Sequence, residues 1–359
     1  MAGSGTGPGK HEYQGGRVEN VGFDPGPLKA LLQARFGGGG ELGLTRVAGG
    51  QSNPTYFLQW GGQRMVLRKQ PGGPLLRGAH AVDREFRVLS ALAGTGVPVP
   101  RAILYHADPT TVGTPFYLME RLEGRVFDDA SLPGLPPGAR RAFYRAMAEA
   151  LARLHGVDPV AVGLGDFGRP ADYFGRQLAR WSRQWAESPV KGIPALDALG
   201  DWLAAHLPAD DGQVAIAHGD YRIGNLLFHP TEARVVGILD WELSTLGHPL
   251  ADLGFCCMAW HTLPAEYGGI KGLDRAALGL PSQQDFVRDY MELARPVGPL
   301  QPFHIAFALF RFAVIFVGIA DRVRQGNASG ENAAGVAPLA GQFAARGLDL
   351  IANAGTAEV

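Results

Sequence analysis

Three oxygen-bearing side chains stand at a spacing that predicts phosphoryl-transfer chemistry. Residues 218–240 read HGDYRIGNLLFHPTEARVVGILD and contain Asp220, then Asn225, then Asp240 at the end of an apolar run. An Asp in such a loop can orient a hydroxyl group and accept its proton, while an Asn and a second Asp can hold Mg²⁺ against a triphosphate. A lone His-Gly-Asp segment is most often only a turn. The prediction therefore depends on the whole set, with Asp220 as the base and Asn225 and Asp240 as metal ligands.

An earlier part of the chain offers a candidate phosphate-binding set for ATP. A strand turn at residues 48–53 has small polar residues whose backbone N–H groups can approach the β- and γ-phosphates. The turn residues assigned to this contact are Gly49, Gly50, Ser52 and Asn53. A cation at the end of the following strand can contact the α- and β-phosphates, and either Arg68 or Lys69 can supply it.

A carboxylate and a connector complete the expected nucleotide site. Glu85, on a predicted helix, can hold the cation in place, with Asp83 as the competing choice. The connector YLMERL follows the last expected strand, and there the backbone groups of Glu120 and Leu122 can meet adenine. Arg222 lies inside the catalytic loop and suits an anionic substrate, although a salt bridge within the loop explains it nearly as well.

The elements that must position these residues divide the chain into two parts. Period-two patterns predict strands at 43–47, 55–60, 63–68, 102–105 and 115–119, with a helix at 80–92. Helical patterns dominate after residue 124, apart from the hairpin that follows the catalytic loop. We therefore expect a disordered tail at 1–20, a β-rich, nucleotide-binding N-lobe at 21–120 and a larger helical, catalytic and acceptor-binding C-lobe at 121–359. The fold class is α+β and bilobal, with the nucleotide expected in the cleft between the lobes.

The bulk composition argues for an ordinary globular enzyme. A net charge of −1 in 359 residues gives no reason to expect a nucleic-acid or membrane partner, and the oligomeric state is not predicted. The two cysteines are adjacent, which favours a reducing compartment and thus the cytoplasm. The long apolar stretch at 303–320 contains His304 and Arg311, so we expect a buried helix there and not a membrane span.

The motifs together resemble the aminoglycoside phosphotransferase/choline kinase superfamily. The matching blocks are GGQSNPTY, VLRKQPGG with AHAVDREFRVL, YLMERLEG, HGDYRIGNLLFHP and ILDWELSTLGHPLADLG. More narrowly, they are similar to the kinase-like domain that is fused to acyl-CoA dehydrogenases in animals and stands alone in bacteria. The resemblance implies a protein-kinase-like fold and ATP- and Mg²⁺-dependent transfer to a hydroxyl, with Arg68 and Glu85 as the cation–carboxylate pair. Related phosphotransferases usually carry Lys where this chain has Arg68.

The resemblance also implies an acceptor, a hydroxyacyl-CoA or a similar hydroxy acid derivative. Polycationic aminoglycosides would need an acidic wall, yet residues 281–359 hold seven acidic residues and six arginines. An aminoglycoside or choline-type kinase remains the alternative enzyme. A nucleotide-binding pseudokinase acting through protein partners is the alternative of another class. The residues Trp241 and Glu242 follow Asp240 where a protein kinase has Phe-Gly, which argues against a protein substrate.

Overall fold

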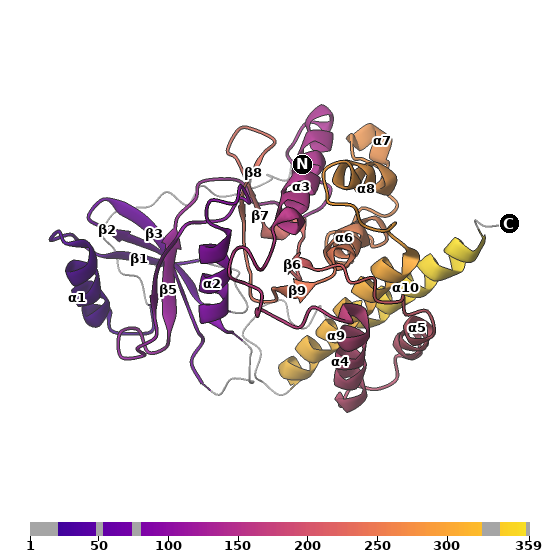
Figure 1. Ribbon diagram of the computed structural model, residues 1–359, viewed down its shortest axis with the longest axis horizontal. Helices are drawn as coiled ribbons and strands as arrows, with labels where there is room; N and C mark the ends of the chain where they lie inside the picture. Colours follow the sequence, from indigo (N-terminus) through magenta and orange to yellow (C-terminus); the bar gives the residue numbers. More distant parts are fainter. Residues whose placement is uncertain (1–20, 48–52, 74–79, 325–337, 357–359) are drawn as a thin grey trace, which may run out of the picture. The chain divides into compact units, whose positions relative to one another are not determined.

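The structure, a computed structural model, describes residues 21–47, 53–73, 80–324 and 338–356. The chain forms two compact units (Figure 1). The first comprises residues 1–86 and 102–121, and the second comprises residues 87–101 and 122–359. Residues 87–101, which the sequence places in the N-lobe, thus group with the second unit. The expected α+β class, with a small β-rich part and a larger helical part, is confirmed.

The first unit is built on a five-stranded antiparallel sheet in the order β1-β2-β3-β5-β4. Its strands are β1 (Gly43–Arg46), β2 (Thr55–Trp60), β3 (Gln63–Lys69), β4 (Ala102–His106) and β5 (Phe116–Glu120). Side chains alternate along β2, where Tyr56, Leu58 and Trp60 are buried. They form one core with Leu28 and Leu32 of helix α1 (Pro25–Phe36), whose first turn is capped by the Asp24 carboxylate.

Helix α2 (Val82–Leu92) follows the sheet's third strand and carries the candidate carboxylate Glu85. The positions Val82, Glu85, Val88, Leu89 and Leu92 recur at helical spacing and are all buried. A carboxylate on this otherwise apolar stripe is unusual, because an unpaired buried charge is strongly disfavoured. The burial of Glu85 therefore requires a partner that compensates its charge.

The second unit is mainly helical (Figure 1). Its α-helices are α3 (Pro137–Gly156), α4 (Tyr173–Glu187), α5 (Pro194–Ala205), α6 (Pro249–Cys257), α7 (Arg275–Leu278), α8 (Gln283–Met291), α9 (Pro302–Arg324) and α10 (Leu339–Thr356). Two short antiparallel pairs stand among them, β6 (Ala215–Ala217) with β9 (Thr245–Gly247), and β7 (Leu226–Phe228) with β8 (Val235–Ile238). The β7–β8 hairpin was expected from the sequence. The β6–β9 pair was not, because a three-residue strand is too short to show a period.

Helix α9 is the apolar element that the sequence predicts to be buried. Its segment Pro302–Asp321 is long and apolar enough to cross a membrane by length and composition, and 83% of the apolar window is buried inside the protein. The helix packs against α10, α6 and α5 of the same unit. That packing is what a core helix shows, so α9 gives weak reason to expect a membrane span.

Candidate active site

The catalytic loop and the β7–β8 hairpin bring two of the predicted residues to one place. The loop after β6 ends in a single 3-10 turn (Ile223–Asn225), and β7 begins at the next residue. β8 pairs antiparallel with β7, and the Leu239 N–H donates to the Asn225 carbonyl at 2.9 Å. Asn225 and Asp240 are therefore neighbours at the same end of the hairpin. Asp240 adopts a left-handed backbone, with φ of 63°.

Asn225 is also tied directly to Asp220. Its Nδ2 donates to the Asp220 backbone carbonyl at 2.8 Å and to the Asp220 Oδ2 at 2.7 Å. Both donor contacts of the amide are thus used within the loop, and its oxygen Oδ1 is left as an acceptor. The spacing of five residues is what allows a side chain to reach back over the turn. The three predicted residues of the second unit are brought together as expected.

Asp220 keeps one carboxylate oxygen without a hydrogen bond. Oδ1 is fully enclosed and has no hydrogen-bond partner among the described residues, although Arg222 Nε lies 3.5 Å away as an ion pair. Burial raises the pKa of Asp220, and the charge of Asp240 raises it further, while Arg222 and His218 oppose the shift. A desolvated carboxylate with a raised pKa is a better proton acceptor than an exposed one.

A second carboxylate, Asp252, holds the backbone of the catalytic loop. It lies in α6, is 1% exposed, and accepts the N–H groups of His218 at 2.6 Å and Gly219 at 2.8 Å. His155 Nε2 lies 3.3 Å from the same carboxylate. Burial alone would raise the pKa of Asp252, but the His155 contact and the Gly219 N–H oppose it, and the pKa is lowered. Of the two roles that the sequence leaves open for Asp252, orienting the loop is the one its contacts support, since His248 caps α6.

Glycine is required where this loop turns. Gly219 has φ of 83°, and a Cβ at this position would lie 2.6 Å from the Leu243 carbonyl oxygen. His218 is fully buried, accepts the Asp220 N–H at its Nδ1 and lies with Nε2 2.9 Å from the Leu239 carbonyl. The side chain of His218 thus joins the loop to the strand end that precedes Asp240. The His-Gly-Asp segment is fixed on both sides of the base.

Arg222 contacts both Asp220 and an aromatic ring. Its guanidinium carbon lies 5.2 Å from the centre of the Tyr267 ring, a cation–π distance, in addition to its ion pair with Asp220. Burial alone would lower the pKa of Arg222, but the carboxylates of Asp220 and Asp240 raise it. The salt bridge weighed in the sequence analysis is therefore present. It does not exclude a substrate contact, because the side chain is still 31% exposed.

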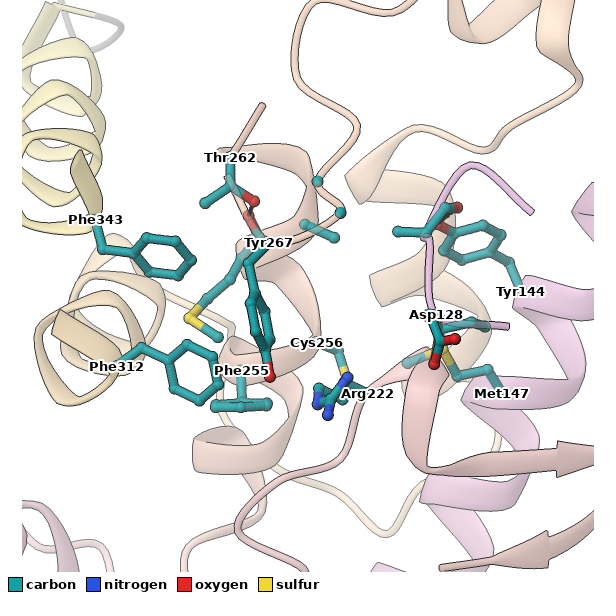
Figure 2. A pocket seen from close by; sticks show the side chains of 16 residues that line it. Asp128, Tyr144, Met147, Arg222, Phe255, Cys256, Thr262, Tyr267, Phe312 and Phe343 are labelled. Carbon is teal, nitrogen blue, oxygen red and sulfur yellow. Dashed lines mark hydrogen bonds between the residues drawn. The ribbon is translucent and has the colours of Figure 1, made fainter. Parts of the chain in front are cut away.

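An apolar pocket opens beside Arg222 (Figure 2). The space in it that a water-sized sphere can reach is about 60 Å³. The labelled lining residues come from α3, α6, α9, α10, the catalytic loop after β6 and the loops before α3 and after α6: Asp128, Tyr144, Met147, Arg222, Phe255, Cys256, Thr262, Tyr267, Phe312 and Phe343. Asp128 and Arg222 are the charged members of this lining. The pocket therefore offers one apolar wall and one pair of opposite charges.

The position of Tyr267 is fixed by contacts of the neighbouring Glu266 with helix α10. It has φ of 66°, which is uncommon for a bulky residue. The preceding Glu266 accepts two bonds from Arg346 of α10, at 2.9 and 2.8 Å, and one from the Leu263 N–H at 2.8 Å. The Tyr267 ring also packs edge-on against Phe312. No sequence signal near Tyr267 marks it, because its partners are far away in the chain.

The first unit contains the predicted cation–carboxylate pair. Arg68 Nε lies 2.9 Å from Glu85 Oε2, and the Glu85 side chain is 2% exposed. Tyr117 also donates to Glu85, at 3.0 Å, and Asn53 Nδ2 donates to its other oxygen at 2.5 Å. His80 in turn lies 3.1 Å from the Asn53 amide oxygen. Glu85 is thus the centre of a buried polar network, and Arg68 compensates its buried charge.

The other predicted residues of this unit lie elsewhere. Lys69 turns away, with Nζ on the Val112 carbonyl and 4.8 Å from the Phe23 ring, so Arg68 is the cation that meets Glu85. Asp83 is exposed. Glu120 pairs with Met65 at the end of β5, and Leu122 begins the connector in the second unit. The predicted turn residues Gly49, Gly50 and Ser52 lie outside the described residues, as do the contacts predicted for them.

The oxygen groups near Asp220 fit a hard divalent cation. Asn225 and Asp240 offer an amide oxygen and a carboxylate, which suit Mg²⁺ when phosphate and water oxygens complete its shell. Within the part of the chain that the structure describes, no cluster of three or more His, Cys, Asp or Glu side chains is arranged for a metal. A shell of few protein ligands is what a magnesium–nucleotide complex needs.

The comparisons with known proteins place this chain in a family. Residues 43–281 match the phosphotransferase enzyme family, and the chain belongs to it. The chain is 42% identical over 310 residues to Acyl-CoA dehydrogenase family member 10 of Mus musculus, covering 85% of this chain and 29% of that protein. It is 42% identical over 339 residues to Acyl-CoA dehydrogenase family member 11 of Gallus gallus, covering 91% of this chain and 43% of that protein. The chain thus spans less than half of these relatives.

Solved structures agree with this assignment. A candidate aminoglycoside phosphotransferase from Ralstonia eutropha JMP134 is 44% identical, with a TM-score of 0.81, covering 91% of this chain and 98% of that one. An aminoglycoside 2′-phosphotransferase-IIIa solved with GDP is 15% identical, with a TM-score of 0.61, covering 89% of this chain and 97% of that one. That second likeness shows the fold alone. The resemblance to kinase-like phosphotransferases predicted from the motifs is confirmed.

Proposed function

We propose that this protein transfers the γ-phosphate of ATP, with Mg²⁺, to a hydroxyl group of a small anionic metabolite. The observation that carries the proposal is the arrangement of Asp220, Asn225 and Asp240 at one end of the β7–β8 hairpin, where Asn225 Nδ2 binds Asp220 Oδ2 and the Asp220 side chain stays 18% exposed. A partly exposed carboxylate with a raised pKa can accept a hydrogen bond, and then a proton, from a substrate hydroxyl. Membership of the phosphotransferase family supports the same reaction class.

Each residue has a distinct part in this proposal. Asp220 accepts the hydroxyl proton and aims the oxygen at the phosphorus atom. Asn225 and Asp240 hold Mg²⁺, which when bound neutralises charge on the triphosphate. In the first unit, Arg68 contacts the α- and β-phosphates while Glu85 fixes its position. An arginine in place of the usual lysine binds phosphate through a planar fork.

The acceptor is proposed to be a hydroxyacyl-CoA or a similar hydroxy acid derivative. Apolar rings and the Arg222 guanidinium line the pocket beside the base, which suits an acyl chain next to a polar acid derivative. An aminoglycoside is a polycation, and the lining offers it one carboxylate, Asp128, beside a repelling arginine. The names of the relatives, acyl-CoA dehydrogenase family members, are in keeping with this acceptor. A cytoplasmic location is part of the same proposal, and Cys256 and Cys257 are free thiols in accord with it.

A panel assay tests the acceptor. The protein is incubated with MgATP and, separately, 4-hydroxyacyl-CoAs, aminoglycosides and choline, and ADP release is measured. Turnover with hydroxyacyl-CoAs is the expected result. Turnover with kanamycin and none with any acyl-CoA would overturn the proposed acceptor, and ATP binding without turnover on any acceptor would favour the pseudokinase.

The base is tested by Asp220→Asn. The variant keeps the shape of the side chain and should still bind ATP, but its turnover should fall by about 10²–10⁴-fold. Calorimetry of ATP binding separates this loss from misfolding. Unchanged turnover would remove Asp220 from the role of base.

A further inference from the structure

A buried arginine that the proposed reaction does not use lies in the middle of α9. Arg311 is 8% exposed, and its Nε is fully enclosed. Among the described residues its guanidinium makes no hydrogen bond and no ion pair. A buried charge without a partner destabilises a protein, because the charge loses its hydration and gains no compensating contact. Such a group is disfavoured unless an anion outside the described residues pairs with it.

Aromatic rings enclose the Arg311 guanidinium. Its central carbon lies 5.4 Å from the centre of the Trp181 ring, in α4, and 5.8 Å from that of Phe255, in α6. Trp181 is itself 6% exposed, and its Nε1 is enclosed with no acceptor among the described residues. Two enclosed N–H donors, one charged and one neutral, thus lie close together and lack an acceptor.

A second guanidinium lies against the same indole. The central carbon of Arg180 is 5.1 Å from the centre of the Trp181 ring. Burial lowers the pKa of Arg180, and the positive charge of Arg311 lowers it further. Two like charges near one ring repel each other, and none of the ion pairs formed by the described residues involves either arginine. The repulsion would be relieved by an anion placed between them.

We infer that α4, α6 and α9 form a binding site for a phosphate group, made by Arg311, Arg180 and the Trp181 indole N–H. A phosphate monoester carries nearly two negative charges and three acceptor oxygens, which matches two guanidinium groups and one neutral donor better than a carboxylate does. The site is separate from the catalytic loop and does not depend on the proposed reaction. Phe255 belongs both to this site and to the lining of the apolar pocket, so the phosphate can be free or part of a larger ligand.

Titration calorimetry with inorganic phosphate, ribose 5-phosphate and acetate tests the site. Wild-type protein should bind phosphate or the ester saturably and acetate at least about tenfold more weakly. Binding of both phosphates indicates a free-phosphate site, and binding of the ester alone indicates a phosphorylated ligand. No saturable binding of either at millimolar concentration would overturn the inference.

Three variants localise the binding. Trp181→Phe keeps the ring and removes the donor, and Arg311→Met removes the charge, so each should weaken phosphate binding about tenfold or more. Arg183→Met, on the exposed side of α4, makes the same change of charge as a control and should leave binding unchanged. In phosphate-free buffer Arg311→Met should also raise Tm, because it removes an unpaired buried charge. Equal phosphate affinity in wild type and Arg311→Met would refute the site, and Trp181→Phe decides the question should Arg311→Met not fold.

Discussion

Replacing Asp252 by Asn weakens the hydrogen bonds that hold the catalytic loop, while the side chain keeps nearly the same shape. The carboxylate accepts two backbone N–H groups, from His218 at 2.6 Å and Gly219 at 2.8 Å. An Asn offers one oxygen, so one of these buried N–H groups would face an NH₂ group and lose its acceptor. Leaving a buried donor unsatisfied costs about 1–3 kcal/mol, and losing the charge weakens the remaining bond. We therefore expect a total loss of about 3 kcal/mol, equivalent to roughly a hundredfold in rate if all of it appears in catalysis.

Two measurements divide this loss between the fold and the reaction. Urea unfolding reports the part that destabilises the protein, and kcat/KM with the acceptor found in the panel reports the part that misplaces Asp220. Asp289→Asn is the matched control, because Asp289 is a buried carboxylate of the same unit that pairs with Arg141 and has no bond to the loop. The control should lose stability with little change in kcat/KM. If Asp252→Asn changed neither quantity, the reasoning from its two backbone contacts would be refuted.

Three further substitutions have defined outcomes. Glu85→Gln removes the charge that holds Arg68 and should weaken ATP binding about tenfold by calorimetry; an unaltered affinity would speak against that pair as part of the nucleotide site. Gly124→Ala places a Cβ 2.4 Å from the Phe228 carbonyl oxygen, so urea unfolding should show a loss of about 1–3 kcal/mol, and a neutral effect would contradict the close approach. Burial lowers the pKa of His304 from 6.5 to about 4. As the pH falls, His304 is protonated in the unfolded chain before it is protonated in the folded protein, because its pKa is lower in the folded protein. The free energy of unfolding should therefore fall by about 1 kcal/mol between about pH 7.5 and about 5.5. His304→Gln should remove that part of the slope, and an identical slope would show that His304 does not cause it.

Much of the site could be predicted because its residues are close in sequence. Asp220, Asn225 and Asp240 fall within one loop and one hairpin, so local geometry brings them together without any knowledge of the fold. The strands of the first unit could also be predicted from the sequence, since buried and less buried side chains alternate along β2. The resemblance implied Glu85 in place of Asp83, and burial distinguishes the two, because Glu85 is 1% exposed and Asp83 is exposed.

The remaining features depend on contacts between distant parts of the chain. Tyr267 approaches Arg222 because Arg346, on another helix, holds the neighbouring Glu266, and no local pattern encodes such a contact. Lys69 and Arg68 are adjacent and carry the same charge, so only the direction in which each side chain leaves its strand distinguishes them. Arg311 was visible as a charge in an apolar stretch, but the absence of a hydrogen-bond partner for its Nε among the described residues is a property of the packed helices.

Part of the pocket wall is encoded far from the catalytic loop, although Arg222 of that loop also lines the pocket. Phe312 and Phe343 lie in α9 and α10, whereas Asp220 and Asn225 lie in the loop after β6. If the proposed acceptor occupies this pocket, substitutions at Phe312 and Phe343 change the shape of its wall without touching Asp220 or Asn225. The acceptor preference and the phosphoryl-transfer step can then change independently of each other.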